Sequence, residues 1–294
     1  MDYRDHKPHL NVALYSLWIS GVGLRQSARE LRITLRNVQN KFVKIGRHMR
    51  DLHRNLMRPI EREASFAFDE AQTFEGCRDT RPLTVPFVIE QSSFFLVDAR
   101  CGPIPPSGGM SVRRRRAIER EREVNGPRPN ASRAVVGAAL ARAAALVPDH
   151  ATVHVRSDLK STYAKLVREA FGAARVLHQQ VSSRLPRNTK NPLHRINLML
   201  AVARDLMSRL RRRSWLISKR AERLDLHLAM FACYRNYLRP RFNGEKESPA
   251  QRLGLLRRRP TKHEMLGWRQ DWPAERCIGP LETATRIEVE ALAG

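Results

Sequence analysis

Residues 65–76, SFAFDEAQTFEG, decide the fold class of this 294-residue chain. Phe66 and Phe68 alternate with small residues and lead into the acid Asp69, a pattern that predicts a half-buried β-strand carrying a carboxylate. A later stretch, ATVHVRSD, repeats the alternation and closes on Asp158. Two strands that each deliver an Asp, in a basic chain, predict a pair of acids that hold a hard divalent metal ion. The alternative is that each Asp only ends its strand as a turn residue.

The order of the elements around these two strands indicates one architecture. RPLTVPFVIE and SSFFLVDARC follow the first strand and predict an antiparallel meander of three strands. An Ala-rich helix, AVVGAALARAAALV, precedes the strand that ends at Asp158, and the helix STYAKLVREAFG and the strand ARVLHQQV follow it. Three strands, helix, strand, helix, strand is the order of a ribonuclease-H-like mixed α/β core. In that core the first and fourth strands are neighbours, so Asp69 and Asp158 should meet.

The net charge indicates the class of partner. The chain has 54 Lys and Arg against 29 Asp and Glu, which gives +25 and a pI near 11.2 and favours a polyanion, with nucleic acid ahead of a membrane surface. No apolar run has the length of a transmembrane helix and no signal peptide follows Met1, so we expect a soluble cytoplasmic protein. Four scattered cysteines without CxxC spacing argue against a zinc site and a disulfide framework.

The N-terminal region has the layout of a helix-turn-helix. The sequence GVGLRQSARELRITLRNVQNKFVKIG predicts a helix at 24–31, a short turn with Thr34 as N-cap, and a second helix from Leu35 to about Ile45. Arg, Asn and Gln can make bidentate contacts with base edges in the major groove. A small helical bundle with a polar outer face is the alternative. The residues expected to contact DNA here are Arg25, Arg36, Asn37, Gln39, Asn40 and Lys41.

The remaining segments are basic. Residues 102–133 are rich in Pro, Gly and charge and predict a mobile insertion with a short charged helix at best, in which the run at 113–116 either grips phosphate or is a solvated block. From Asn191 onward a basic helical region should hold the phosphodiester beside the acids, unless its charges are only a solvated face. Trp268 and Trp272 are expected to dock on the core. We therefore divide the chain into a DNA-binding segment (1–57), a catalytic core (58–220) and a basic helical region with a tail (221–294).

Four motifs in this order resemble bacterial DDE transposases of the insertion-sequence-one type. GVGLRQSARELRITLRNVQNKF is similar to the family's helix-turn-helix, and FAFDEAQTF and VRSDLKSTYAKL resemble its first two catalytic segments. HRINLMLAVARDLMSRLRRRSWLISK is similar to the last motif, so that the resemblance covers about residues 20 to 237. It implies a nucleoid-associated bacterial transposase that acts as a homo-oligomer on double-stranded DNA. The enzyme would nick transposon ends and transfer the freed 3′ hydroxyl to target DNA.

The resemblance also implies roles for single residues. Asp69 and Asp158 would hold Mg²⁺ or Mn²⁺, and Arg195, Arg209 and Lys219 would neutralise backbone phosphate. The family's third acid falls on His194, which could ligate a metal through nitrogen although Mg²⁺ favours oxygen. Asp205, further along the same helix, is the other acid available there. The family's Cys-rich zinc module is absent from the N-terminal side.

Two other functions remain open from the sequence. A decayed copy that still binds DNA but no longer cleaves it is the leading alternative, because His194 replaces the third acid. An RNA-binding protein without nuclease activity is the other, and it would be marked by competition from RNA and no requirement for metal.

Overall fold

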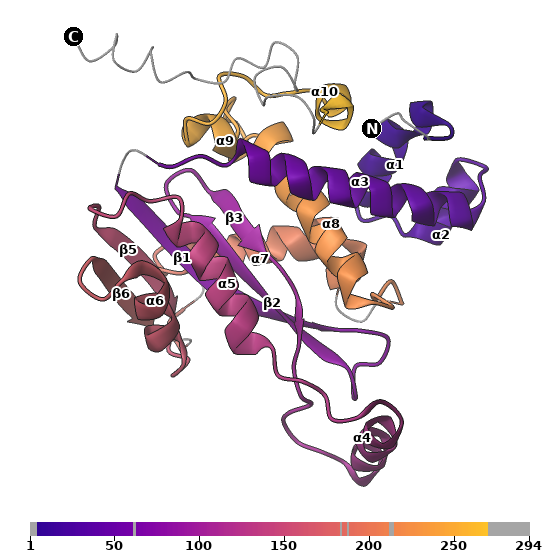
Figure 1. The fold of residues 1–294 in the computed structure, drawn as a ribbon, viewed down its shortest axis with the longest axis horizontal. Coiled ribbons are helices and arrows are strands. Elements are labelled where there is room, and N and C mark those ends of the chain that lie inside the picture. The colour runs from indigo at the N-terminus through magenta and orange to yellow at the C-terminus, as the bar shows by residue number, and fades with distance from the viewer. Residues whose placement is uncertain (1–4, 61–62, 183, 187, 212–214, 270–294) are drawn as a thin grey trace.

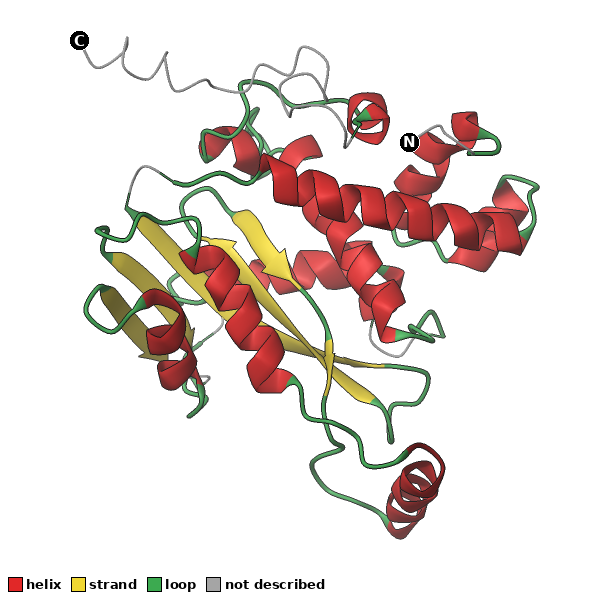
Figure 2. Cartoon of the chain, in the orientation of Figure 1, coloured by secondary structure: helices red, strands yellow, loops and turns green. Residues whose placement is uncertain are grey.

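The computed structural model describes residues 5–60, 63–182, 184–186, 188–211 and 215–269 (Figure 1). Within these residues one six-stranded mixed sheet is flanked by helices on both faces, which confirms the mixed α/β class (Figure 2). The strands are β1 (Ala64–Phe74), β2 (Pro82–Glu90), β3 (Phe95–Ala99), β4 (Gly102–Pro103), β5 (Val153–Asp158) and β6 (Val176–Val181).

The helices surround the sheet in three groups along the chain. The N-terminal group is η1 (Pro8–Leu10), α1 (Asn11–Trp18), α2 (Leu24–Glu30) and α3 (Leu35–Leu56). The central group is α4 (Val112–Asn125), α5 (Ser132–Ala144) and α6 (Tyr163–Phe171). The C-terminal group is α7 (His194–Leu206), η2 (Ser208–Leu210), α8 (Ala221–Cys233), η3 (Tyr234–Leu238), α9 (Pro249–Arg252) and α10 (Lys262–Gly267).

The strand order in the sheet is β3-β2-β1-β5-β6, and the short β4 pairs with β2. β1 and β2 are antiparallel, as are β2 and β3, which confirms the expected meander. β5 lies parallel to β1, and β6 lies parallel to β5. The predicted contact between the first strand and the strand that ends at Asp158 is therefore confirmed.

Alternation along β1 divides the interior into two layers. Phe66 and Phe68 point to one face, where they pack in the same apolar cluster as residues of α5 and α6. Ala67 and Ala71 point to the other face and pack with residues of α7, such as Ala203. In Figure 1 α5 and α6 lie in front of the sheet and α7 lies behind it. Asp69 lies two residues from each of these alanines, so its side chain points to the same face of the sheet, the one covered by α7.

α3 is the longest helix of the described chain and extends well past the predicted end near Ile45. Thr34 caps it as expected, since its side chain accepts a hydrogen bond from the Asn37 backbone N–H at 3.3 Å. Gly46 lies inside the helix, and its lack of a side chain leaves space for α8. A Cβ at Gly46 would lie 2.6 Å from Leu226 Cβ.

The segment predicted as a mobile insertion contains α4, a charged helix that is longer than the short one expected within residues 102–133. α4 has 14 residues, and the Ser111 side chain caps it by accepting a hydrogen bond from the Arg114 N–H. Ion pairs connect α4 to the segment between β1 and β2: Arg81 with Glu121 at 2.6 Å, and Arg114 with Asp79 at 3.7 Å. In Figure 1 α4 stands away from the sheet at the end of two connecting loops.

The three segments predicted as domains share one interior. A single apolar cluster joins Met49 of α3, Phe66 of β1 and Met230 of α8. Trp268 docks on the same cluster with 1% of its surface exposed, as expected, whereas Trp272 and the acidic C-terminal end lie outside the described residues. No helix in the described part of the chain is long and apolar enough to cross a membrane.

Candidate metal centre and nucleic-acid interface

The pairing of β1 with β5 brings Asp69 and Asp158 together. The paired residues of the two strands end at Ala67 of β1 and Arg156 of β5, and each acid lies two residues further along its own strand. Paired residues of parallel strands project from the same face, and residues two apart share that face. The two carboxylates therefore stand side by side on the α7 face, although 89 residues separate them in the sequence.

Asp69 is held in an environment that disfavours its charge. The pKa of Asp69 is raised to about 6, chiefly by burial and also by the negative charges of Asp158 and Glu70, against the lowering effect of a hydrogen bond from the Glu70 backbone N–H at 2.7 Å. The positive charge of Arg204 on α7 also lowers this pKa. Two neighbouring carboxylates, of which Asp69 has a raised pKa, form a site that a cation would stabilise.

The loop after β5 fixes the second acid and connects it to Glu70. The Lys160 backbone N–H donates to Asp158 Oδ1 at 3.1 Å, and Lys160 Nζ donates to Glu70 Oε1 at 2.6 Å. Tyr163 and Thr84 also donate to the Glu70 carboxylate, at 2.8 and 2.5 Å. Burial raises the pKa of Glu70, but these hydrogen bonds outweigh it and leave the pKa below its usual value. Glu70 thus joins β1 to β2 and α6 from the opposite face of the sheet.

The sequence pattern singled out Asp69 and gave no role to Glu70, the next residue. The structure gives it one, since it fixes the strand and the loop that carry the two candidate ligands. The signal for this role was weak, because its partners Thr84, Lys160 and Tyr163 come from three other segments of the chain.

His194 does not join the two acids. Among the residues that the structure describes, no group of three or more His, Cys, Asp or Glu side chains is placed to hold a metal ion. His194 begins α7, and the next residue, Arg195, donates to the Gln91 and Ser92 carbonyls in the turn between β2 and β3. Arg204, whose charge acts on Asp69, lies ten residues further on, about 15 Å along the helix axis. Asp205 likewise belongs to no group of three or more possible metal ligands among the described residues.

α2, the turn at 31–34 and α3 present an exposed polar face. Helical periodicity places six residues of α3 on one side, opposite the buried Val38, Ile45, Met49 and Leu52. Arg47 and Arg54 extend this face beyond the residues that the sequence singled out, and they were missed because the helix was expected to end earlier. The six residues on this side, all of them exposed, are Arg36, Gln39, Asn40, Arg47, Arg50 and Arg54. Arg25 on α2 is also exposed, and Asn37 is half-buried.

Lys41 was expected to contact DNA and is instead part of the interior. Its side chain is buried, and its ammonium lies 3.1 Å from Asp5 Oδ1 and 2.7 Å from Asn11 Oδ1. These bonds fasten the N-terminal segment and α1 to α3. The correction has a positional cause, because Lys41 is adjacent to the buried Phe42 on the helix and its partners lie 36 and 30 residues away in sequence.

Two of the three cations expected to grip phosphate behind the acids are engaged within the protein. Arg195 donates to the backbone carbonyls described above. Arg209 stacks 4.9 Å from the Phe42 ring centroid and donates to Ser218 Oγ, and burial lowers its pKa to about 10. Lys219 is exposed. Arg209 is therefore a packing residue between η2 and α3, which corrects its expected role.

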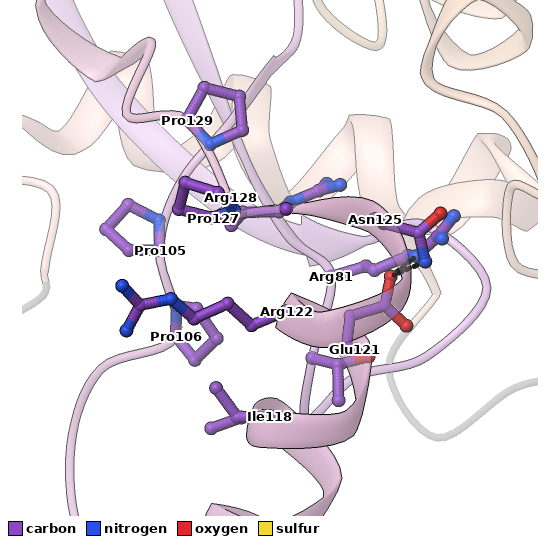
Figure 3. Close-up of a pocket in the computed structure, with 12 residues that line it drawn as sticks. Arg81, Pro105, Pro106, Ile118, Glu121, Arg122, Asn125, Pro127, Arg128 and Pro129 are labelled. Carbon is purple, nitrogen blue, oxygen red and sulfur yellow. Dashed lines mark hydrogen bonds and ion pairs between the residues drawn. The ribbon is translucent and has the colours of Figure 1, made fainter.

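A cavity of about 380 Å³ lies between α4 and the loops that connect it to the sheet (Figure 3). Prolines form much of its wall, at positions 105, 106, 127 and 129, and Arg122 points across it. Two of its arginines are paired with acids: Arg81 with Glu121, and Arg128 with Glu75 at 3.4 Å. Neither Asp69 nor Asp158 lines this cavity, so it is separate from the candidate metal centre.

Comparisons of the chain with protein-family models and with curated proteins found no match.

Proposed function

We propose that the protein is a DNA-processing enzyme of the transposase type, which binds DNA through α2 and α3 and cleaves and transfers strands at a divalent-metal centre formed by Asp69 and Asp158. The observation that carries the proposal is the meeting of these two acids on adjacent parallel strands. The strand order β3-β2-β1-β5-β6, with β2 antiparallel and β5 parallel to β1, is compatible with the expected ribonuclease-H-like sheet and supports the proposal.

The donor set at this centre fits Mg²⁺ or Mn²⁺. Magnesium is commonly held by one or two carboxylates and completes its shell with water and substrate phosphate oxygens. Two Asp carboxylates, one of them with a pKa raised to about 6, provide such a partial shell and gain from a neighbouring positive charge. A divalent ion bound there would supply Lewis-acid stabilisation of the charge that develops on the phosphodiester.

The chain's own residues position the site and the substrate. Lys160 and the Glu70 carboxylate hold the end of β5 against β1, so the two acids keep their spacing. Arg204 places a positive charge near the acids from α7. The exposed face of α3 provides Arg, Asn and Gln side chains that suit phosphates and base edges in a major groove. DNA held on this face would be retained by the high net positive charge of the chain.

The test is strand cleavage of a supercoiled plasmid in Mg²⁺ or Mn²⁺. The wild-type protein should nick the plasmid only with a divalent ion, and Asp69→Ala and Asp158→Ala should each abolish nicking while retaining DNA binding. Asp205→Ala, which removes an exposed acid from α7, is the matched control and should nick normally. Nicking by Asp69→Ala at the wild-type rate would contradict the proposal.

A DNA-binding protein without nuclease activity is the second candidate. The observation that favours it is the absence of a third ligand group beside the two acids in the described part of the chain. Under this alternative the wild-type protein would shift DNA in a binding assay but would not nick it in either metal ion. An RNA-binding function would instead appear as tighter binding to RNA than to DNA of the same length, independent of metal.

A further inference from the structure

Trp215 is the most exposed large apolar side chain among the described residues, with 99% of its surface accessible. An indole in water forgoes the stabilisation that its burial would provide, so the exposed ring of Trp215 is available for a contact outside the folded chain. The other described tryptophans, Trp18 and Trp268, have at most 1% of their surface exposed.

Arg211 and Leu216, on either side of Trp215 in the sequence, contact the N-terminal segment. Arg211 packs against Gly21 and donates to the Asp205 carbonyl at 3.0 Å. Leu216 packs against Gly23 so closely that a Cβ there would lie 2.7 Å from Leu216 Cδ2. Gly21 and Gly23 immediately precede α2, so Trp215 is held beside the first helix of the proposed DNA-binding face. The Gly-Val-Gly of the sequence provides the space for this contact.

The same segment reaches the strand that carries Asp69. Ser218, three residues after Trp215, forms a bridge with Glu75, and the Gly76 N–H donates to the Ser218 carbonyl at 2.8 Å. Glu75 lies six residues beyond Asp69, about 20 Å along an extended strand. Trp215 therefore lies near the start of α2 and near the C-terminal end of β1, the strand that carries Asp69.

The chemistry around Trp215 selects one class of partner. Arg25, Lys219 and Arg220 are exposed in the two segments that meet here. A partner that offers flat ring faces between negative charges fits this combination of an exposed indole and exposed cations. Nucleobases between phosphates have that chemistry, and bases with free ring faces occur in single strands and at opened duplex positions.

We propose that Trp215 stacks on an unpaired nucleobase and so holds an opened strand between the α2–α3 face and the acid pair. The inference rests on the proposed DNA function and adds to it a preference for a strand whose bases are unstacked. Stacking of one base on an aromatic side chain contributes roughly 1 to 3 kcal/mol, which corresponds to about a 5- to 150-fold change in affinity.

The experiment measures the affinity of a fluorescein-labelled 20-nucleotide single strand and of the same sequence as a duplex, by fluorescence anisotropy. Trp215→Ala should weaken single-strand binding about tenfold or more and change duplex binding less than twofold. Trp215→Phe keeps a ring and should recover most of the single-strand affinity. Leu177→Ala, which truncates a 57% exposed side chain on β6, is the matched control and should bind both probes as the wild type does.

The outcomes separate this inference from the proposed function. Wild-type protein that binds neither probe overturns both. Wild-type protein that binds the probes, with Trp215→Ala indistinguishable from it, overturns the stacking role alone. Equal weakening on both probes, or loss of a dimer in sedimentation without a change in single-strand affinity, would also contradict it, because Trp215 would then serve the duplex or a second copy of the chain. Equal melting temperatures of the variants show that folding is unaffected.

Discussion

Asp69 shows how one residue links the fold to the proposed chemistry. Its pKa is raised to about 6 from an ordinary value of 3.8, first by burial and then by the neighbouring carboxylates. In the unfolded chain these influences are absent. The folded state therefore binds the Asp69 proton more tightly than the unfolded state does, and it is destabilised as pH rises from about 4 to about 6.

Asp69→Asn should therefore stabilise the protein above pH 6. We expect the free energy of unfolding at pH 7.5 to rise by about 1 to 3 kcal/mol, since two pKa units correspond to roughly that amount, and to change little at pH 4. Urea denaturation at the two pH values measures this difference. Asp205→Asn is the control, and an equal gain from it at pH 7.5 would assign the effect to net charge. A gain for Asp69→Asn that is larger at pH 4 than at pH 7.5 would contradict the raised pKa.

A second prediction concerns the buried ion pair of Lys41. Lys41→Ala should lower the free energy of unfolding by less than the roughly 3 to 5 kcal/mol of a fully orphaned buried charge, because Lys44 remains 3.7 Å from Asp5. DNA affinity measured below the melting temperature should fall no more than that of Lys165→Ala, an exposed Lys on α6. A large loss of DNA affinity with unchanged stability would restore the original interpretation of Lys41 as a DNA contact.

Single residues also show the limit of sequence reasoning. The acids Asp69 and Asp158 could be predicted because strand alternation and strand order are local patterns, and together they determine which strands meet. Lys41, Arg195 and Arg209 could not, since a cation exposed on its own helix and a cation buried by distant segments have the same local pattern. Their partners lie on segments that only the folded chain brings close.

At the scale of elements, the exposed face of α3 should read DNA sequence. Arg36→Ala and Asn40→Ala should each weaken binding to a selected cognate duplex by about 1 to 3 kcal/mol, with a smaller effect on random DNA. Arg54→Ala, at the far end of the same face, should weaken both duplexes equally if it contacts only phosphate. Competition binding with cognate and random duplexes measures these ratios. Equal weakening of both duplexes by Arg36→Ala would show that the start of α3 only contacts the backbone.

The length of α3 was underestimated for a physical reason. A glycine commonly follows the last turn of a helix, and Gly46 stands directly after the expected end at Ile45. In the structure Gly46 lies inside the helix and allows α8 to approach, because a Cβ at this position would lie only 2.6 Å from Leu226 Cβ. The continuing apolar residues Met49, Leu52 and Leu56 were the signal that could have corrected the boundary.

At the scale of the whole molecule, the net charge of +25 predicts salt-dependent binding. The logarithm of duplex affinity should fall against the logarithm of salt concentration by roughly 0.9 for each phosphate contacted. Arg47→Ala should make this slope shallower by about 0.9, the contribution of one phosphate contact, if that residue lies on a phosphate. Anisotropy titrations at several salt concentrations give the slope, and a nearly flat dependence would exclude a mainly electrostatic interaction.

The topology of the whole molecule was the part that the sequence predicted best. The meander, the crossover to β5 and the contact of β5 with β1 follow from element order and alternation. The packing of the N-terminal helices and α8 into one shared core was not predictable in the same way. It depends on apolar faces far apart in the chain, such as Met49 and Met230, whose pairing no local pattern specifies.

The most direct test of the central claim is binding of Mn²⁺ to the protein alone at pH 7.5, followed by electron paramagnetic resonance. We expect that the wild-type protein binds Mn²⁺, that Asp69→Asn and Asp158→Asn each weaken this binding strongly, and that His194→Ala binds as the wild type does. The metal requirement is thereby measured without any catalytic readout. Mn²⁺ binding that survives in Asp69→Asn and Asp158→Asn but is lost in His194→Ala would contradict the claim that the paired acids of β1 and β5 form the metal centre.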